Sequence, residues 1–176
     1  MRKTAVLAAV VLALAAADVG ALDIAISAGY QYQLTYLTDF AGGFAVQEST
    51  VSLDLRAWPY PLQLGLGFSR VYVGPLDAPV NTFENFLLTA DYWLLDTPLG
   101  SLPLRVHLGA GAWVTLPIVE FGLRGSAGLR WTPIPSDKGF EIWADLVPVV
   151  GMYVTPFTAL KVGGSAGLGL RYWFGR

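Results

Sequence analysis

The chain has 176 residues, of which 54% are hydrophobic and 14% are charged, and it contains no cysteine. Disulfides are therefore excluded, and the charge content is below the roughly 25–35% expected of a soluble protein surface. The net charge of −2 also excludes a basic surface that would attract nucleic acid.

The mean hydropathy is +0.51. Beyond the N-terminal segment, however, the chain has no run of the roughly 18 apolar residues that a transmembrane helix needs. In lipid every backbone N–H and C=O group needs a partner, and only helices and closed barrels provide one throughout. A hydrophobic chain without helical spans therefore favours a β-barrel.

Residues 1–21 are predicted to form a cleaved signal peptide. Arg2 and Lys3 provide the basic start, residues 5–17 are apolar throughout, and small residues up to Ala21 fit a cleavage site. Cleavage after Ala17 is an alternative. An uncleaved anchor is another, but the apolar stretch is short for a span. Residues 22–176 then form the mature barrel domain.

Eight segments of the mature chain alternate apolar and polar residues with a period of two. This is the pattern of β-strands, in which successive side chains point to opposite faces. In chain order the segments span about residues 23–34, 49–58, 62–70, 85–94, 104–114, 119–132, 140–152 and 160–174. Prolines and glycines separate them, and the longest predicted connections lie near residues 35–48 and 71–84.

Two of these segments depart from strict alternation. Arg70 falls on the apolar face of the third segment, so it lies either beyond the apolar band or after a β-bulge that resets the alternation. In the seventh segment the pattern after Val147 is irregular around Pro148.

The last segment shows the alternation most clearly. One face is aliphatic and ends in Tyr172 and Phe174, and the other carries Lys161, Ser165 and Arg171 among several glycines. This pattern indicates a strand of a transmembrane barrel, with its apolar face toward lipid and its polar face toward the lumen.

Apart from Arg70, the charged residues within the strand bodies fall on the face opposite the aliphatic one. A soluble barrel would show the same alternation with the apolar face turned inward. Here, however, the polar face mixes both charge signs with glycines and with Trp58, Trp93, Trp113, Trp143 and Trp173. Aromatic residues also form two rims, as interfacial girdles do. One rim has Tyr30, Tyr32, Phe68, Phe86 and Phe121, and the other has Tyr92, Trp131, Phe140, Tyr172 and Phe174.

The interior of an eight-stranded barrel is just wide enough to be filled by side chains, and charges buried there must pair. The polar faces predict a lumen network of Asp54, Arg56, Asp91, Arg105, His107, Glu120, Arg124, Arg130, Glu141, Asp145, Lys161 and Arg171. Simple hairpin registers predict three cross-strand pairs, which are Asp91 with His107, Trp93 with Arg105, and Glu141 with Arg130. Such a network either plugs the barrel or gates a narrow pore, and we expect a plug.

His107 is the only histidine. A catalytic role would need a serine and a carboxylate nearby, and no serine follows it directly in the sequence. A single histidine among dispersed carboxylates also lacks the ligand cluster of a metal site. Glycine pairs such as Gly65 and Gly67 are not followed by a helix, which a nucleotide fingerprint requires. We therefore expect no catalytic, metal or cofactor site.

The C-terminal run 169–174 resembles the signal that the barrel-assembly machinery reads, with Gly169, Tyr172 and Phe174 as its main residues. Gly167 departs from it, because that signal usually has a polar residue there, and two further residues follow Phe174. The mature chain as a whole resembles the small eight-stranded outer-membrane barrels of the OmpA, OmpX and OmpW type. The resemblance implies contact with outer-membrane lipid and with the assembly machinery. It also implies roles that range from envelope stability and adhesion to the passage of small apolar molecules.

The sequence therefore predicts an all-β fold, an eight-stranded antiparallel up-and-down transmembrane β-barrel in the outer membrane of the cell. We expect a monomer with periplasmic termini, with its longest connections outside the cell and with a structural or interactive role in the envelope. A narrow, porin-like channel for small solutes is the alternative. A lipid-modifying enzyme is a third hypothesis.

Overall fold

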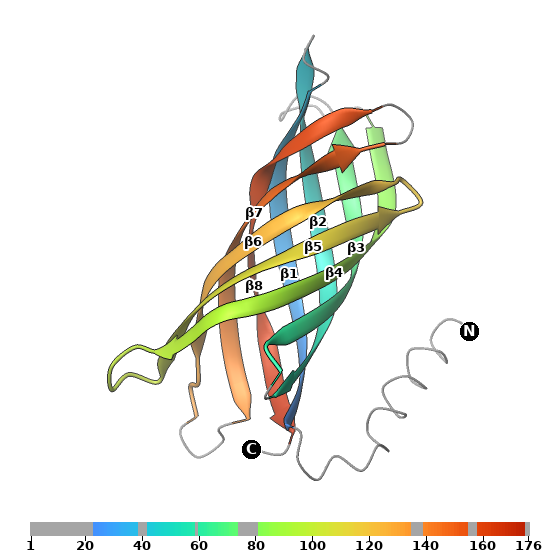
Figure 1. Ribbon diagram of the computed structural model, residues 1–176. Helices are drawn as coiled ribbons and strands as arrows, with labels where there is room; N and C mark the ends of the chain where they lie inside the picture. Colours follow the sequence, from blue (N-terminus) through green and yellow to red (C-terminus); the bar gives the residue numbers. More distant parts are fainter. Residues whose placement is uncertain are drawn as a thin grey trace, which may run out of the picture.

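The computed structural model describes residues 23–38, 42–58, 60–73, 81–134, 139–154 and 158–174. Eight antiparallel strands close into one barrel, each pairing with the next and the last with the first (Figure 1). They are β1 (Asp23–Thr38), β2 (Gly43–Trp58), β3 (Leu62–Val73), β4 (Asn81–Pro98), β5 (Leu104–Leu116), β6 (Glu120–Trp131), β7 (Phe140–Tyr153) and β8 (Ala159–Phe174). The predicted fold class is confirmed. The predicted signal peptide, 1–21, lies outside the described residues.

Within the described ranges no helix is long and apolar enough to cross a membrane.

β1 begins and β8 ends at the same end of the barrel, which we call the terminal end (Figure 1). β2, β4 and β6 also end there. β1, β3, β5 and β7 end at the opposite end of the barrel, which we call the loop end.

The strands are staggered by a fixed amount around the barrel. Following paired residues once around gives Ala25, Arg56, Gln63, Asp91, Gly111, Arg124, Val149, Gly163 and Thr35. The path returns to β1 ten residues further along, from 25 to 35. Ten residues of about 3.3 Å over eight strands about 4.8 Å apart give a strand tilt of about 40°. Membrane barrels have tilts in this range.

Side chains alternate between the lumen and the outer surface along the strands. In β8, Leu168 is 64% exposed and Lys161 only 1%. The tryptophans of the polar faces are buried at Trp93, Trp113, Trp143 and Trp173, while the side chain of Trp58 lies outside the described part. The predicted sidedness is confirmed, because the aliphatic stripe faces outward and the ionic stripe is enclosed.

Most aromatic residues of the two predicted rims are exposed on the outer wall. At the rim nearer the loop end these are Tyr30, Tyr32, Phe68, Phe86 and Phe121, and at the terminal end Tyr92, Trp131, Tyr172 and Phe174. Phe140 is half-buried. The rings of Phe68 and Phe86 meet edge to face with centroids 5.9 Å apart. The outer wall therefore carries an apolar band with aromatic residues toward both ends.

The strands reach further toward the loop end than predicted. The long connections predicted at 35–48 and 71–84 are wrong, because β1 runs to Thr38, β2 begins at Gly43, β3 runs to Val73 and β4 begins at Asn81. Beyond the aromatic rim, polar residues such as Gln47 occupy the outer face. In this part of the strands the sequence no longer alternates between polar and apolar residues, although the backbone pairing continues.

Arg70 lies on the outer surface beyond the aromatic rim. It is opposite Glu84, two residues further along than the facing pair Phe68 and Phe86, and its Nη2 lies 3.0 Å from a Glu84 oxygen. The pairing of β3 with both neighbours is continuous. The bulge considered for this position is therefore wrong, and the position beyond the apolar band is correct.

A β-bulge occurs instead in β4, at Leu94. The register with β5 shifts between Trp93 and Leu95, and both leucines are exposed on the outer wall. The extra residue reverses the alternation, so that Asp96 turns toward the lumen.

β7 keeps its alternation to the end, contrary to the irregular pattern expected after Val147. Val147 and Val149 are buried in the lumen and Pro148 is exposed on the outer wall. The irregularity in the sequence arises because the inward residues here are apolar, so that both faces are apolar together.

Candidate functional site

The lumen at the terminal end contains an arginine layer organised around Asp96. The Asp96 carboxylate accepts a hydrogen bond from Arg105 Nε at 2.8 Å, another from Arg130, and a longer one from Arg56 Nη2 at 3.4 Å. The side chains of Arg56 and Arg130 are 2% exposed, whereas that of Arg105 is 39% exposed at the rim. One carboxylate of β4 thus connects β2, β5 and β6 across the lumen.

Glu141 extends this layer to β8. Its Oε2 lies 3.2 Å from Arg130 Nη1 and 3.7 Å from Arg171 Nη1. Arg171 also donates a hydrogen bond from Nη2 to Gln63 Oε1 at 2.9 Å. These contacts compensate charges that would otherwise be buried at a large energetic cost.

Trp93 fills the centre of the arginine layer. The guanidinium carbon of Arg56 lies 3.5 Å from the Trp93 ring centroid, and those of Arg130 and Arg171 lie at 4.8 and 5.3 Å. The His107 ring stacks on the same indole, with centroids 4.1 Å apart and planes 18° apart. Cation–π attraction and stacking therefore hold this cross-section closed.

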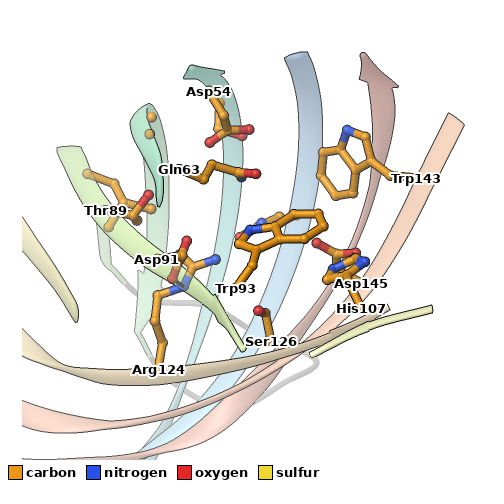
Figure 2. Close-up of a pocket in the computed structure, with 15 residues that line it drawn as sticks. Asp54, Gln63, Thr89, Asp91, Trp93, His107, Arg124, Ser126, Trp143 and Asp145 are labelled. Atoms are coloured by element: carbon orange, nitrogen blue, oxygen red, sulfur yellow. Dashed lines mark ion pairs between the residues drawn. The ribbon is translucent and has the colours of Figure 1, made fainter. Parts of the chain in front are cut away.

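A small polar cavity lies next to the arginine layer, further along the lumen. Figure 2 shows Asp91 and Arg124 on one side of Trp93 and His107 and Asp145 on the other. Arg124 Nε lies 3.1 Å from Asp91 Oδ1, and His107 Nε2 lies 3.1 Å from Asp145 Oδ1. The cavity volume is about 20 Å³, which is room for one or two water molecules.

Lys161 forms the charged centre of the lumen toward the loop end. Its Nζ lies 2.5 Å from Glu120 Oε2 and 3.3 Å from Glu48 Oε2, and Gln33 donates a hydrogen bond to the same Glu48 oxygen. The side chains of Lys161 and Glu120 are 1% exposed and that of Glu48 is 4% exposed. The ammonium group also lies 4.9 Å from the ring centroid of Trp113.

An apolar cluster, which we call the apolar plug, lies in the lumen at the loop end. It consists of the buried side chains of Leu37, Val46, Val71, Tyr153 and Ala159, with Phe44 and Ile118 packed against them. Each of the five is no more than 6% exposed. An apolar constriction of this kind excludes water and therefore ions.

The lumen charges nearly balance. Within the described residues, six basic side chains and six carboxylates take part in the lumen ion pairs, besides His107. Asp54 adds one more acidic group, and its partner is the Ser27 hydroxyl, which donates to it at 3.3 Å. The summed charge of these lumen groups is therefore close to zero.

The structure places all twelve predicted lumen residues on the inner side of the wall, but two of the three predicted cross-strand pairs are wrong. Asp91 lies opposite Gly111, and Trp93 lies opposite Gly109. The cause is the longer β4, which places the turn further along the chain than the predicted hairpin does, whereas the bulge at Leu94 shifts the pairing by only one residue.

The third predicted pair is in contact although its register differs. Arg130 lies directly opposite Trp143, yet its guanidinium reaches Glu141. A long side chain can bridge such a diagonal step.

Two lumen carboxylates were missed, Glu48 and Asp96. The sequence assigned both to connections. The uninterrupted alternation of Glu48, Thr50 and Ser52 was the signal for the first. The adjacent Leu94 and Leu95, a duplication typical of a bulge, was the signal for the second.

The structure also brings Ser126 into the cavity that His107 and Asp145 line (Figure 2). Ser126 comes from β6, where it faces Gly109 rather than His107, so the sequence around His107 could not show it. The described part of the chain contains no group of three or more histidine, cysteine or acidic residues placed to hold a metal ion.

The residues of the predicted C-terminal signal lie in β8. The Tyr172 and Phe174 rings are exposed on the outer wall and meet edge to face, with centroids 5.0 Å apart. Gly169 faces the lumen, where a Cβ atom would collide with the Trp143 ring.

Solved structures of other proteins align with most of this chain. The crystal structure of Neisserial surface protein A aligns with a TM-score of 0.60 at 16% identity, covering 86% of this chain and 97% of that one. The N-terminal β-barrel domain of Pseudomonas aeruginosa OprF aligns with a TM-score of 0.47 at 15% identity, covering 86% and 97%. The outer membrane protein AlkL, solved in DMPC lipid bilayers, aligns with a TM-score of 0.43 at 12% identity, covering 87% and 89%.

The likeness to the Neisserial protein shows a shared fold. The fold implied by the resemblance to the small eight-stranded outer-membrane barrels is thus confirmed. No family model matches this chain, and no curated protein matches it in sequence.

Proposed function

We propose that the protein is an integral outer-membrane barrel whose role is structural or interactive and whose lumen is closed. Support for the membrane location comes from the outer wall, where exposed residues such as Leu123 and Leu168 form an apolar band between aromatic rims. Only lipid makes such a surface favourable, since an apolar patch of this extent in water would promote association.

The single observation that supports the closed lumen is that buried side chains cluster in it toward both ends. The arginine layer around Trp93 fills the cross-section at the terminal end, and the apolar plug fills it at the loop end. Between them the polar cavity holds only about 20 Å³. A hydrated ion would have to break several buried ion pairs and then cross an apolar constriction, and both steps are costly.

Conductance in planar bilayers tests the closed lumen. We expect the refolded protein to show no steady conductance. A variant that opens both ends, with Leu37 and Val46 of the plug and Arg56 and Trp93 of the arginine layer replaced by alanine, should show single-channel steps, which would show that the assay detects this barrel. Steps from the unmodified protein would instead favour the narrow channel.

The same occlusion argues against an enzymatic role for His107. The cavity that it shares with Ser126 has room for water but not for a lipid substrate. We expect His107→Ala to leave lipid A in the host membrane unchanged in mass. A mass shift caused by this substitution would favour the lipid-modifying enzyme.

The proposed partners are outer-membrane lipid along the apolar band and the barrel-assembly machinery at the C-terminal signal. Tyr172 and Phe174 point outward from β8, so a docking partner can reach them before the barrel is surrounded by lipid. We infer a monomer, because the barrel is closed and its strands leave no unpaired edge for a second copy.

A further inference from the structure

The outer wall has a groove centred on β8. Its floor is formed by the small residues Gly164 and Ala166, and its walls by Tyr32 and Leu34 of β1 and by Leu146 and Pro148 of β7. The groove volume is about 410 Å³, far larger than the cavity inside the lumen. None of the residues that line it carries a charge.

Pro148 explains why the wall is recessed here. Gly125, Pro148 and Gly164 occupy equivalent places on three adjacent strands, with Pro148 directly opposite Gly164. The pairing of β6 with β7 is interrupted beside Pro148, between Arg124 and Ala127, since proline has no N–H to donate.

The proline ring packs toward β6 and leaves the β8 side empty. A Cβ atom on Gly125 would lie 3.1 Å from Pro148 Cγ, closer than side chains normally approach. A Cβ atom on Gly164 would meet nothing nearer than 3.5 Å. Gly164 is therefore not required by local packing, and the space above it is available to another molecule.

The width of the groove limits the kind of molecule that can bind in it. The walls stand on β1 and β7, which flank the single strand β8, so their backbones are about 10 Å apart before side chains narrow the gap. A helix with its side chains is about 10–12 Å across and would not fit between them. The outer wall of a second barrel is broader still. A single alkyl chain fits.

The volume of the groove is also consistent with a single alkyl chain. A methylene group is similar in size to a water molecule, and a groove of about 410 Å³ that is open to the outside has room for several methylene groups in a row. Tyr32 is a fixed wall, because its hydroxyl donates a hydrogen bond to Gln47 Oε1 at 2.6 Å. The groove lies at the loop-end edge of the apolar band, where Tyr32 belongs to the aromatic rim, and it follows the tilt of β8. Its uncharged and mostly apolar lining suits hydrocarbon.

We propose that this groove binds one acyl chain of a membrane phospholipid and holds it longer than the surrounding lipid holds its neighbours. The inference rests on the proposed membrane location. The recess lets a chain contact the barrel on three sides rather than one, which multiplies the dispersion contacts that each methylene makes.

Native mass spectrometry tests the site with the protein refolded in dimyristoylphosphatidylcholine vesicles and then transferred to detergent. The wild type should retain one phospholipid. Ala166→Leu and Gly164→Leu, which fill the floor, should lower the retained fraction about tenfold by removing most of those contacts. Ala90→Leu is the matched control, because Ala90 is also an exposed outward alanine and lies four strands away on β4. It should leave retention unchanged.

Heat-modifiable gel migration shows separately whether each variant has folded into the vesicles. If the wild type fails to insert, the membrane location fails and the groove proposal with it. If all variants insert and the filled grooves retain phospholipid as the wild type and Ala90→Leu do, the groove proposal alone is overturned. If one filling variant does not fold, the other decides the test.

Discussion

Replacing Lys161 by methionine should be among the most damaging single changes in the lumen. It removes the ammonium group between Glu48 and Glu120 while leaving both carboxylates almost fully buried. At an effective dielectric constant of about 20, Coulomb's law gives about 5 kcal/mol for the 3.3 Å contact with Glu48. Removal of one partner from a buried pair costs about 3–5 kcal/mol, and we expect a loss of that size.

The assay is urea unfolding of the protein in lipid vesicles, followed by tryptophan fluorescence. The triple variant Lys161→Met, Glu48→Gln and Glu120→Gln should recover most of the stability, because neutral groups carry no uncompensated charge. Arg70→Met is the control outside the lumen, since its pair with Glu84 is exposed to solvent and should contribute nothing measurable. A Lys161→Met variant as stable as Arg70→Met would refute the reasoning about buried charge.

Three further variants, two substitutions and one deletion, test other parts of the structure. Gly29→Val should destabilise the barrel by about 1–3 kcal/mol through overpacking, because its side chain would collide with the Trp143 ring, and adding Trp143→Leu should recover most of the loss in the same unfolding assay. Deletion of Leu94 should remove the bulge but keep Asp96 in the lumen, because Trp93 and Leu95 then face Gly109 and Leu108 in unbroken register; unfolding at nearly the same urea concentration is expected, and a large loss of stability would contradict it. Phe174→Ala should reduce assembly in cells, seen as less heat-modifiable protein, yet leave refolding in vitro intact; equal yields in cells would remove the C-terminal signal.

The sequence was sufficient to predict the barrel architecture, because the alternation within each strand shows which of its side chains face the lumen and which face outward. In β8 the polarity of each side chain predicts which side of the barrel wall it faces, as for Lys161 inside and Leu168 outside. This prediction does not require knowing which strand pairs with β8. The identities of the inward residues follow from the same rule, so twelve lumen positions could be assigned without a structure.

The predictions that were wrong or incomplete concerned features that depend on interactions between strands. The bulge at Leu94 changes the register with β5, and nothing in β4 alone fixes where the extra residue is accommodated. The contacts across the lumen, such as that of Lys161 with Glu48, depend on the stagger of the closed barrel and join residues 113 positions apart. The strand ends near Thr38 and Gly43 were not predicted, because the outer face becomes polar there while the backbone pairing of β1 with β2 continues.

The central claim is that the aliphatic stripe meets hydrocarbon and the ionic stripe is enclosed. The chain contains no cysteine, so a single cysteine can carry a nitroxide label at Leu168, on the outer wall, and a second variant, Ser126→Cys, places a thiol in the lumen. In phospholipid vesicles, paramagnetic relaxation should show the Leu168 label exposed to oxygen and shielded from a water-soluble nickel reagent. The thiol of Ser126→Cys should react with a water-soluble maleimide only after the barrel is unfolded. A Leu168 label that the nickel reagent reaches freely would contradict the account.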